Sequence, residues 1–276
     1  MSVKIIIDTD AKNEIDDQYA ITYAVLSKEL DVLGFTASHY AKNRSMEKSY
    51  DEIIHVLKLL GKEKRYPVFR GAETALRDKK TPADSPAAMF MIEEAQKITE
   101  GPLWIVSIGA ITNLASAYLI HPGIKDRVKL IWLAGKRWPR GGFTFNDKND
   151  ILAAQIIFGS DIDFTLVPVC RPASKLKIYC RDKARIKGKG AIGDYLWRLF
   201  IMRRFGFPKP VYDVAAVAAV KSRDLYTAET APRPAFLDNG KYDHSMTVGE
   251  IKVVTGINVE KIRADFFALL DGSIRK

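Results

Sequence analysis

The chain has 276 residues, of which 47% are hydrophobic, and a formal net charge of +10. This length can bury a large core, whereas two cysteines are too few for a disulfide framework, so a small disulfide-stapled fold is excluded. No apolar stretch is long enough to span a membrane, and the first residues leave no room for a signal peptide. We therefore expect one cytoplasmic domain over residues 1–276, with buried free thiols at Cys170 and Cys180.

The first element is a short β-branched run at Ile5, Ile6 and Ile7, which is typical of a strand buried on both faces of a parallel sheet. Apolar residues at helical spacing follow from Ile15 to Leu26, with Asn13 or Asp16 as candidate caps. The segment between them, "DTDAKNEIDD", carries five carboxylates. It lies between a buried strand and a helix N-terminus, where α/β proteins bind ligands.

Strand and helix signals then alternate along the chain. We predict strands at 31–38, 66–71, 103–109, 128–135 and 163–169, and helices at 49–61, 86–98, 113–120, 211–221 and 260–270. A hairpin is expected around "DNGKYD" (238–243), and residues 184–210 are not assigned. This alternation predicts an α/β fold with a largely parallel, Rossmann-like central sheet and helices on both faces.

The basic residues concentrate in two segments, 181–190 and 203–209. We interpret both as solvated faces rather than as a nucleic-acid groove, and expect only a general attraction for anionic ligands. "GKGAIG" (188–193) has the glycine spacing of a dinucleotide site but follows no buried strand, so we interpret it as a flexible loop. The four histidines lie in separate elements without metal-ligand spacing: His39, His55, His121 and His244.

The acidic segment has several interpretations. A solvated loop is the simplest, but crowded carboxylates repel one another unless a cation or proton relieves them. An EF-hand loop needs an oxygen ligand where Lys12 stands and a glycine at Asn13. A haloacid dehalogenase-type phosphotransferase also begins with Asp-x-Asp after a strand, but it favours Thr or Val at the position of Lys12.

A third chemical interpretation, beside the EF-hand and the phosphotransferase, rests on four motifs in order. "DTDAKNEIDD" resembles the Asp-x-Asp-Pro-Gly-x-Asp-Asp motif of the inosine-uridine-preferring nucleoside hydrolase family, with two extra residues and no Pro-Gly. "IGAITNLASA" (108–117), "FTFNDKNDILAAQ" (143–155) and "VYDVAAVA" (211–218) are similar to its later motifs. The resemblance covers residues 3 to about 220. It implies the family's α/β fold and N-ribohydrolase activity.

The resemblance also implies a Ca²⁺ site. The carboxylates of Asp10, Asp17 and Asp213 and the backbone carbonyl of Thr112 would hold the ion, a set of hard oxygen ligands that Ca²⁺ prefers. The ion would lower the pKa of a water molecule, and Asp10 would take its proton as general base. Asp8 would brace the loop. Thr112, with Asn113, is also expected to cap the helix at 113–120.

Substrate residues are implied in the same way. Asp16 would bind the ribose 2′-hydroxyl and Asn146 another side of the sugar. Tyr212 stands where relatives carry His or Trp, and we expect its ring to stack on the base, with Phe145 or Trp138 as a second wall. Thr144 replaces the Glu of the third motif, which alters one ribose contact.

The sequence thus predicts a Ca²⁺-dependent hydrolase that cleaves the N-glycosidic bond of a ribonucleoside or related ribosyl compound. Two alternatives stay open: a metal-dependent hydrolase of another sugar derivative, and a non-catalytic relative that binds ribose or nucleic acid. We expect a small nucleoside-like substrate as partner, no membrane, and a homo-oligomer. The base and the pathway are not defined by the sequence.

Overall fold

A central eight-stranded sheet organises the protein, whose computed structural model describes residues 2–40, 42–204 and 207–273. The strand order is β3-β2-β1-β4-β5-β6-β10-β9, and every neighbouring pair is parallel except β10 and β9. The strands are β1 (Val3–Thr9), β2 (Leu30–Ala37), β3 (Val68–Arg70), β4 (Leu103–Ser107), β5 (Val128–Leu133), β6 (Asp163–Val167), β9 (Tyr226–Phe236) and β10 (Tyr242–Ile257). A separate antiparallel pair joins β7 (Lys177–Ile178) to β8 (Lys209–Pro210). The predicted largely parallel sheet is confirmed.

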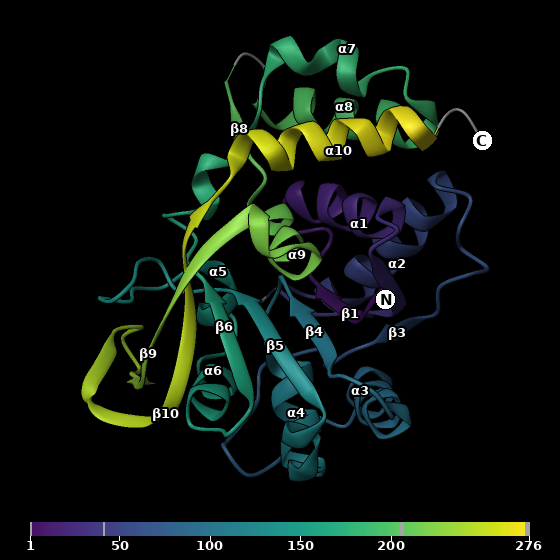
Figure 1. The fold of residues 1–276 in the computed structure, drawn as a ribbon. Coiled ribbons are helices and arrows are strands. Elements are labelled where there is room, and N and C mark those ends of the chain that lie inside the picture. Colours follow the sequence, from purple (N-terminus) through teal and green to yellow (C-terminus); the bar gives the residue numbers. More distant parts are fainter. Residues whose placement is uncertain (1, 41, 205–206, 274–276) are drawn as a thin grey trace.

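Helices cover both faces of the sheet (Figure 1). One face carries α1 (Asp16–Leu26), α2 (Ser45–Leu59) and α9 (Tyr212–Lys221), and the other carries α3 (Pro86–Lys97), α4 (Thr112–Ile120) and α6 (Ile151–Phe158). An outer layer lies over α1 and contains α7 (Lys183–Ile186), α8 (Gly190–Arg204) and α10 (Val259–Ser273). The short α5 spans Phe145–Lys148, and 3₁₀ turns span Pro122–Asp126, Ala173–Lys175, Cys180–Asp182 and Arg223–Leu225.

The buried first strand supplies both halves of the core. Ile5 and Ile7 belong to the apolar cluster beneath α1, whereas Ile6 belongs to the cluster on the opposite face with Trp132. Successive strand residues point to opposite faces, so a strand covered on both sides reads as an unbroken apolar run. Of the helices in the described part of the chain, none is long and apolar enough to cross a membrane.

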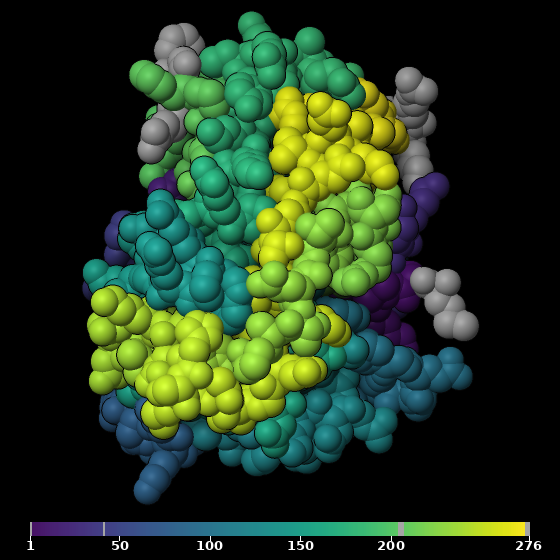
Figure 2. Space-filling view, turned by 60° about the vertical axis from the view of Figure 1, so that its left-hand side comes forward, coloured from purple at the N-terminus to yellow at the C-terminus, as the bar shows by residue number. Residues whose placement is uncertain are grey.

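The expected C-terminal hairpin is present as β9 and β10. Its turn lies at 237–240, where the Gly240 nitrogen donates to the Leu237 carbonyl, and β10 joins the sheet beside β6 through Lys252 and Val253. Local sequence does not encode this pairing, because its partner, β6, lies far away in the chain. Figure 2 shows the hairpin, in lime and yellow, as a raised lobe on the surface.

Two further expectations are corrected. Residues 190–193 of the glycine motif form the start of α8 rather than a flexible loop, although the strand required for dinucleotide binding is indeed missing before them. The thiols are unpaired as expected, but they are not buried: Cys170 is half-buried and Cys180 is exposed. The small number of cysteines therefore predicted that the thiols are unpaired, but it did not predict how exposed they are.

Candidate active site

A cavity of about 330 Å³ lies beyond the carboxyl ends of the central strands. Asp10 follows β1, Ile108 follows β4, Leu133 ends β5 and Val169 comes just after β6, and all four line it. Parallel strands end at one edge of a sheet, which is why segments distant in sequence meet there. The remaining lining residues are Asn13, Glu14, Asp16, Asp17, Lys136, Phe143, Thr144, Phe145, Asn146, Cys170, Lys209, Tyr212 and Asp213.

Asp8 lies in the sheet and not in the cavity lining. Its carboxylate accepts hydrogen bonds from the Thr36 hydroxyl (2.7 Å), the Ser107 hydroxyl (3.1 Å) and the Asn113 amide (2.8 Å). These donors come from β2, β4 and α4, so Asp8 ties together three elements around β1. Burial raises the pKa of Asp8 to about 6 although the three donors lower it. Asp8 was predicted to brace the acidic loop, but its side-chain contacts instead join β1 to β2, β4 and α4.

Three carboxylates meet at the N-termini of two helices. Asp16 and Asp17 begin α1, Asp213 is the second residue of α9, and one oxygen from each lies within 4.8 Å of the others. All three side chains are buried. Helix N-termini favour negative charge, and α1 packs against α9, which brings the two acidic ends together. Neither helix has a side-chain cap, so the predicted capping by Asn13 or Asp16 is wrong.

Few protein donors neutralise this cluster. Asp17 accepts a hydrogen bond from the Thr9 hydroxyl (2.5 Å), and the backbone of Tyr212 donates to Asp16. Within the described residues, no side chain donates to Asp213. Burial and then mutual repulsion raise the pKa of Asp17 and of Asp213 well above the usual range. The Lys209 ammonium opposes this rise for Asp16 and Asp213 but does not cancel it. Buried hard oxygen donors that keep an excess of negative charge fit a divalent cation such as Ca²⁺.

Asp10 lies in the same cavity with 2% of its surface exposed. Its only side-chain hydrogen bond among the described residues comes from the Asn13 amide at 3.1 Å. Burial, followed by repulsion from Asp16, raises the pKa of Asp10 to about 8. Gly109 allows this packing, because a Cβ there would lie 3.0 Å from the Asp10 nitrogen and 2.2 Å from the Ser38 hydroxyl.

The predicted sugar and base residues Asn146, Thr144, Phe145 and Tyr212 also line the cavity. The Asn146 amide nitrogen donates to the Ile108 and Leu133 carbonyls (2.9 and 2.8 Å), which fixes the side chain at the cavity. The Thr144 hydroxyl is already engaged, since it forms a capping box with Asp147 at the start of α5. Phe145 also lines the cavity and is 71% exposed, so its ring stands at the mouth. Tyr212, the first residue of α9, lines the cavity as well.

Two predicted residues are not brought to the cavity. The Thr112 hydroxyl donates to Asp150 (2.7 Å) and lies 3.0 Å from the His39 ring, and the segment reaches the cavity at Ile108 instead. Neither Thr112 nor Asn113 caps α4, because Ile111 is the cap and forms no side-chain bond. Trp138 packs against Tyr242 in the C-terminal hairpin, with ring centroids 5.6 Å apart. The chain leaves the cavity after Lys136, which carries Trp138 away.

Several lining residues were missed. Lys209 belongs to the basic segment 203–209 that we interpreted as a solvated face; residues 205–206 of it lie outside the described residues. Its ammonium is instead buried and pairs with Glu14 at 2.8 Å, 195 positions away. The sequence holds no signal for this contact. In contrast, the ends of the predicted strands could have indicated Leu133 and Val169, because such positions face the crevice.

Comparison with solved structures identifies the fold. The structure entitled "Plant nucleoside hydrolase - PpNRh1 enzyme" superposes with a TM-score of 0.81 at 21% identity, covering 98% of this chain and 99% of that one. A purine-preferring ribonucleoside hydrolase from Gardnerella vaginalis gives 0.78 at 20% identity, with 98% of both chains covered. At these identities the likeness concerns the fold, which is that of the nucleoside hydrolases.

Comparison of sequences defines the family. The profile of the inosine-uridine preferring nucleoside hydrolases matches residues 5–264. A pyrimidine-specific ribonucleoside hydrolase, RihA, of Escherichia coli O1:K1 / APEC is 28% identical over 291 residues, covering 93% of this chain and 91% of the relative. RihA of E. coli O8 (strain IAI1) is 27% identical over the same length. The chain belongs to the inosine-uridine preferring nucleoside hydrolase family and is an enzyme of the N-ribohydrolase type.

Proposed function

We propose that the protein is a Ca²⁺-dependent hydrolase that cleaves the N-glycosidic bond of a ribonucleoside. The observation that carries this proposal is the buried cluster of Asp16, Asp17 and Asp213 beside Asp10. These carboxylates have few protein donors, and Asp213 has no side-chain donor among the described residues. The cavity that they line is large enough for a sugar. The family match and the RihA relatives support the same reaction class.

Asp17 and Asp213 would hold the cation together with Asp10. When bound, Ca²⁺ supplies positive charge that keeps these carboxylates ionised and makes a water molecule more acidic. Asp10 would take a proton from the attacking water as general base, while Asn13 holds one of its carboxylate oxygens. The water oxygen would form a bond to C1′ of the ribose as the bond from C1′ to the base breaks, through an oxocarbenium-like state. The base would leave with the electron pair of that bond and take up one proton, which balances the proton that Asp10 removes.

The ribose is held from two sides in this proposal. Asp16 accepts a hydrogen bond from the 2′-hydroxyl, and Asn146 offers its carbonyl oxygen because its amide nitrogen is committed to two backbone carbonyls. Tyr212 and Phe145 provide aromatic surface for the base.

Three further predictions are kept: a single domain, a cytoplasmic location and a homo-oligomer. The two unpaired thiols favour the cytoplasmic location, and light scattering would test the oligomeric state.

A second candidate is a ribosyl compound with an acidic substituent. Thr144 stands where the family motif carries Glu, and its hydroxyl is occupied by Asp147. Lys136 lines the same cavity, and its ammonium has no carboxylate partner among the described residues. An anionic group such as a 5′-phosphate would complement this lysine.

The test is a panel of ribonucleosides and their 5′-monophosphates, incubated with and without Ca²⁺, with free base and reducing sugar measured. The Asp10→Asn variant serves as the control for contaminating activity. Release of base from a nucleoside only in the presence of Ca²⁺ supports the first candidate, and preference for the monophosphate supports the second. Absence of cleavage across the panel would refute both.

A further inference from the structure

The loop of residues 11–14 between Asp10 and α1 is held at every position. The Ala11 carbonyl accepts from Gln18 (2.6 Å), and the Lys12 ammonium pairs with Glu52 (2.5 Å). Arg203 donates to the Asn13 carbonyl (3.0 Å), and Lys209 pairs with Glu14 (2.8 Å). This is the loop that carries two extra residues and lacks the Pro-Gly of the family motif. Contacts from distant elements therefore replace a stiff local turn.

Glu52 is the centre of these contacts. It lies on α2, with only 4% of its side chain exposed, and accepts from Lys12 and from the Gln18 amide (2.9 Å). The hydroxyl of Tyr195 on α8 also donates to Glu52. One carboxylate thus joins the loop, α1, α2 and α8.

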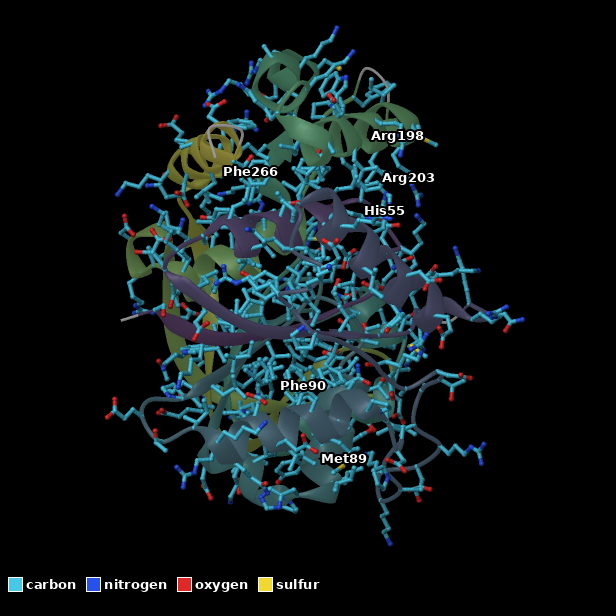
Figure 3. The ribbon with its side chains drawn as sticks, turned by 90° about the vertical axis from the view of Figure 1, so that its right-hand side faces the viewer. His55, Met89, Phe90, Arg198, Arg203 and Phe266 are labelled. Carbon is cyan, nitrogen blue, oxygen red and sulfur yellow. The ribbon has the colours of Figure 1, made fainter. Side chains whose placement is uncertain are left out.

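The α2–α8 contact around Glu52 is well packed. The His55 and Tyr195 rings meet edge to face with centroids 4.9 Å apart, and the Arg198 guanidinium lies 5.1 Å from the Tyr195 ring. Figure 3 shows Arg198 and Arg203 on α8 facing His55 on α2 along one side of the molecule. The carboxylate is consequently anchored between two helices and presents a fixed acceptor to Lys12.

Movement of this loop would displace Asp10, the proposed general base, because Asn13 is bonded to it. Asn13 bonds to Asp10 twice, through its backbone nitrogen to the Asp10 carbonyl (2.8 Å) and through its amide to the carboxylate (3.1 Å). At the other end, Glu14 is two residues from Asp16. Reaction rates respond steeply to displacements of the order of 1 Å in such groups.

We propose that Glu52 is a positioning residue for the N-ribohydrolase reaction, which orders the loop 11–14 through Lys12 and Gln18 and so fixes Asp10. The kinetic part of this inference rests on the proposed function. The inference goes beyond that function because it assigns a role to a side chain outside the cavity lining.

The test compares Glu52→Gln with Asp265→Asn. Asp265 on α10 is a matched control, because it also accepts from a tyrosine and a lysine, Tyr23 and Lys221, but does not touch the loop. We expect Glu52→Gln to lower kcat roughly ten- to a hundredfold with little change in KM. Asp265→Asn should leave kcat within about twofold of the wild-type value, even if it lowers the melting temperature as much as Glu52→Gln does.

Hydrogen exchange of the backbone amides at 11–14 provides a readout that does not need activity. These amides should exchange faster in Glu52→Gln than in the wild type or in Asp265→Asn. Should Glu52→Gln fail to fold, Lys12→Met takes its place, since the Lys12 side chain is 49% exposed.

The outcomes are separable. Unchanged loop exchange overturns the inference, and so does faster exchange with an unchanged kcat in an active enzyme. A wild-type protein that cleaves no nucleoside refutes the proposed function instead, while the exchange result still decides whether Glu52 orders the loop. A double-mutant cycle of Lys12→Met and Glu52→Gln should give strongly non-additive losses in kcat.

Discussion

Asp8 and Asp213 are both buried acidic side chains near the carboxyl end of the sheet, yet their surroundings differ. Three side chains from three elements donate to Asp8, whereas no described side chain donates to Asp213. Both have a raised pKa because both are buried. Burial alone therefore does not separate a structural carboxylate from a functional one. The number of protein donors does, because a carboxylate without them requires a cation or a proton.

The largest expected effect comes from Asp10, which has one side-chain donor and lies in the cavity. Asp10→Asn keeps the shape of the side chain but cannot accept the proton of water. We expect kcat to fall roughly 100- to 10,000-fold. Steady-state kinetics with Ca²⁺ present would measure this, and circular dichroism would confirm that the variant is folded. A variant with near-normal turnover would remove Asp10 as the base.

Removal of the cation should act next most strongly, and only through the cluster. A chelator should lower activity. It should also lower the melting temperature, because a ligand bound only by the native state stabilises it by about 2.7 kcal/mol at a hundredfold excess over its Kd. In Asp213→Asn the added Ca²⁺ should no longer raise the melting temperature. Calorimetry in chelator and in Ca²⁺ tests both statements, and equal melting temperatures for the wild type in the two buffers would contradict them.

Asp8→Asn sharpens the comparison from the other side. The Asn amide nitrogen would stand where one Asp8 oxygen accepts from the Ser107 hydroxyl, which disturbs one buried hydrogen bond, so the free energy of unfolding should fall by about 1–3 kcal/mol. The shift of melting temperature on adding Ca²⁺ should persist, since Asp8 does not line the cavity. If Asp8→Asn loses the Ca²⁺ shift and keeps its stability in chelator, the division between the two kinds of carboxylate is wrong.

Tyr212 tests the aromatic side of the cavity. Stacking needs the ring and not the hydroxyl, so Tyr212→Phe should retain most of the activity on a nucleoside. Tyr212→Ala should lose roughly ten- to a hundredfold in kcat/KM, in line with about 1–3 kcal/mol for one base-aromatic stack. Equal and severe losses in both variants would make the hydroxyl a participant instead.

The smallest expected effect is on the pH dependence of stability. It concerns Asp147, a buried carboxylate that accepts hydrogen bonds from protein donors. Burial raises its pKa to about 6 although Thr144 and the Gly135 backbone donate to it. The native state then binds this proton more tightly than the unfolded chain does, so Asp147 should contribute a fall in stability of no more than about 2 kcal/mol as pH rises from about 4 to 6. Urea unfolding at several pH values in chelator measures the total slope, to which Asp8 and the cavity carboxylates also contribute because their pKa values are raised as well. Asp147→Asn should reduce the slope by the contribution of this one group, and an unchanged slope would contradict the assignment.

The sequence predicted the features that depend on local pattern. The run of Ile5 to Ile7 indicated a strand covered on both faces, and the carboxylates after it indicated a site at the edge of the sheet. The order of the motifs predicted that Asp213 lies near Asp17, and in the structure their carboxylate oxygens do lie close together. Such signals work because a strand end and a helix start have recognisable compositions.

The features that depend on long-range contacts were not predictable. The Lys209–Glu14 pair and the pairing of β10 with β6 leave no local signature. Motif similarity also indicated the turn after β4, where Ile108 rather than Thr112 is among the lining residues. The Thr112 carbonyl as a metal ligand stays a prediction. A motif locates a segment, whereas packing decides which atom of that segment faces the site.

Isothermal titration of the chelated protein with Ca²⁺ tests the central claim most directly, because it reads the cation site without requiring a substrate. The account predicts about one Ca²⁺ per chain for the wild type and for Asp8→Asn, and no measurable binding for Asp213→Asn. Absence of binding to the wild type, or equal binding by the wild type and Asp213→Asn, would contradict it.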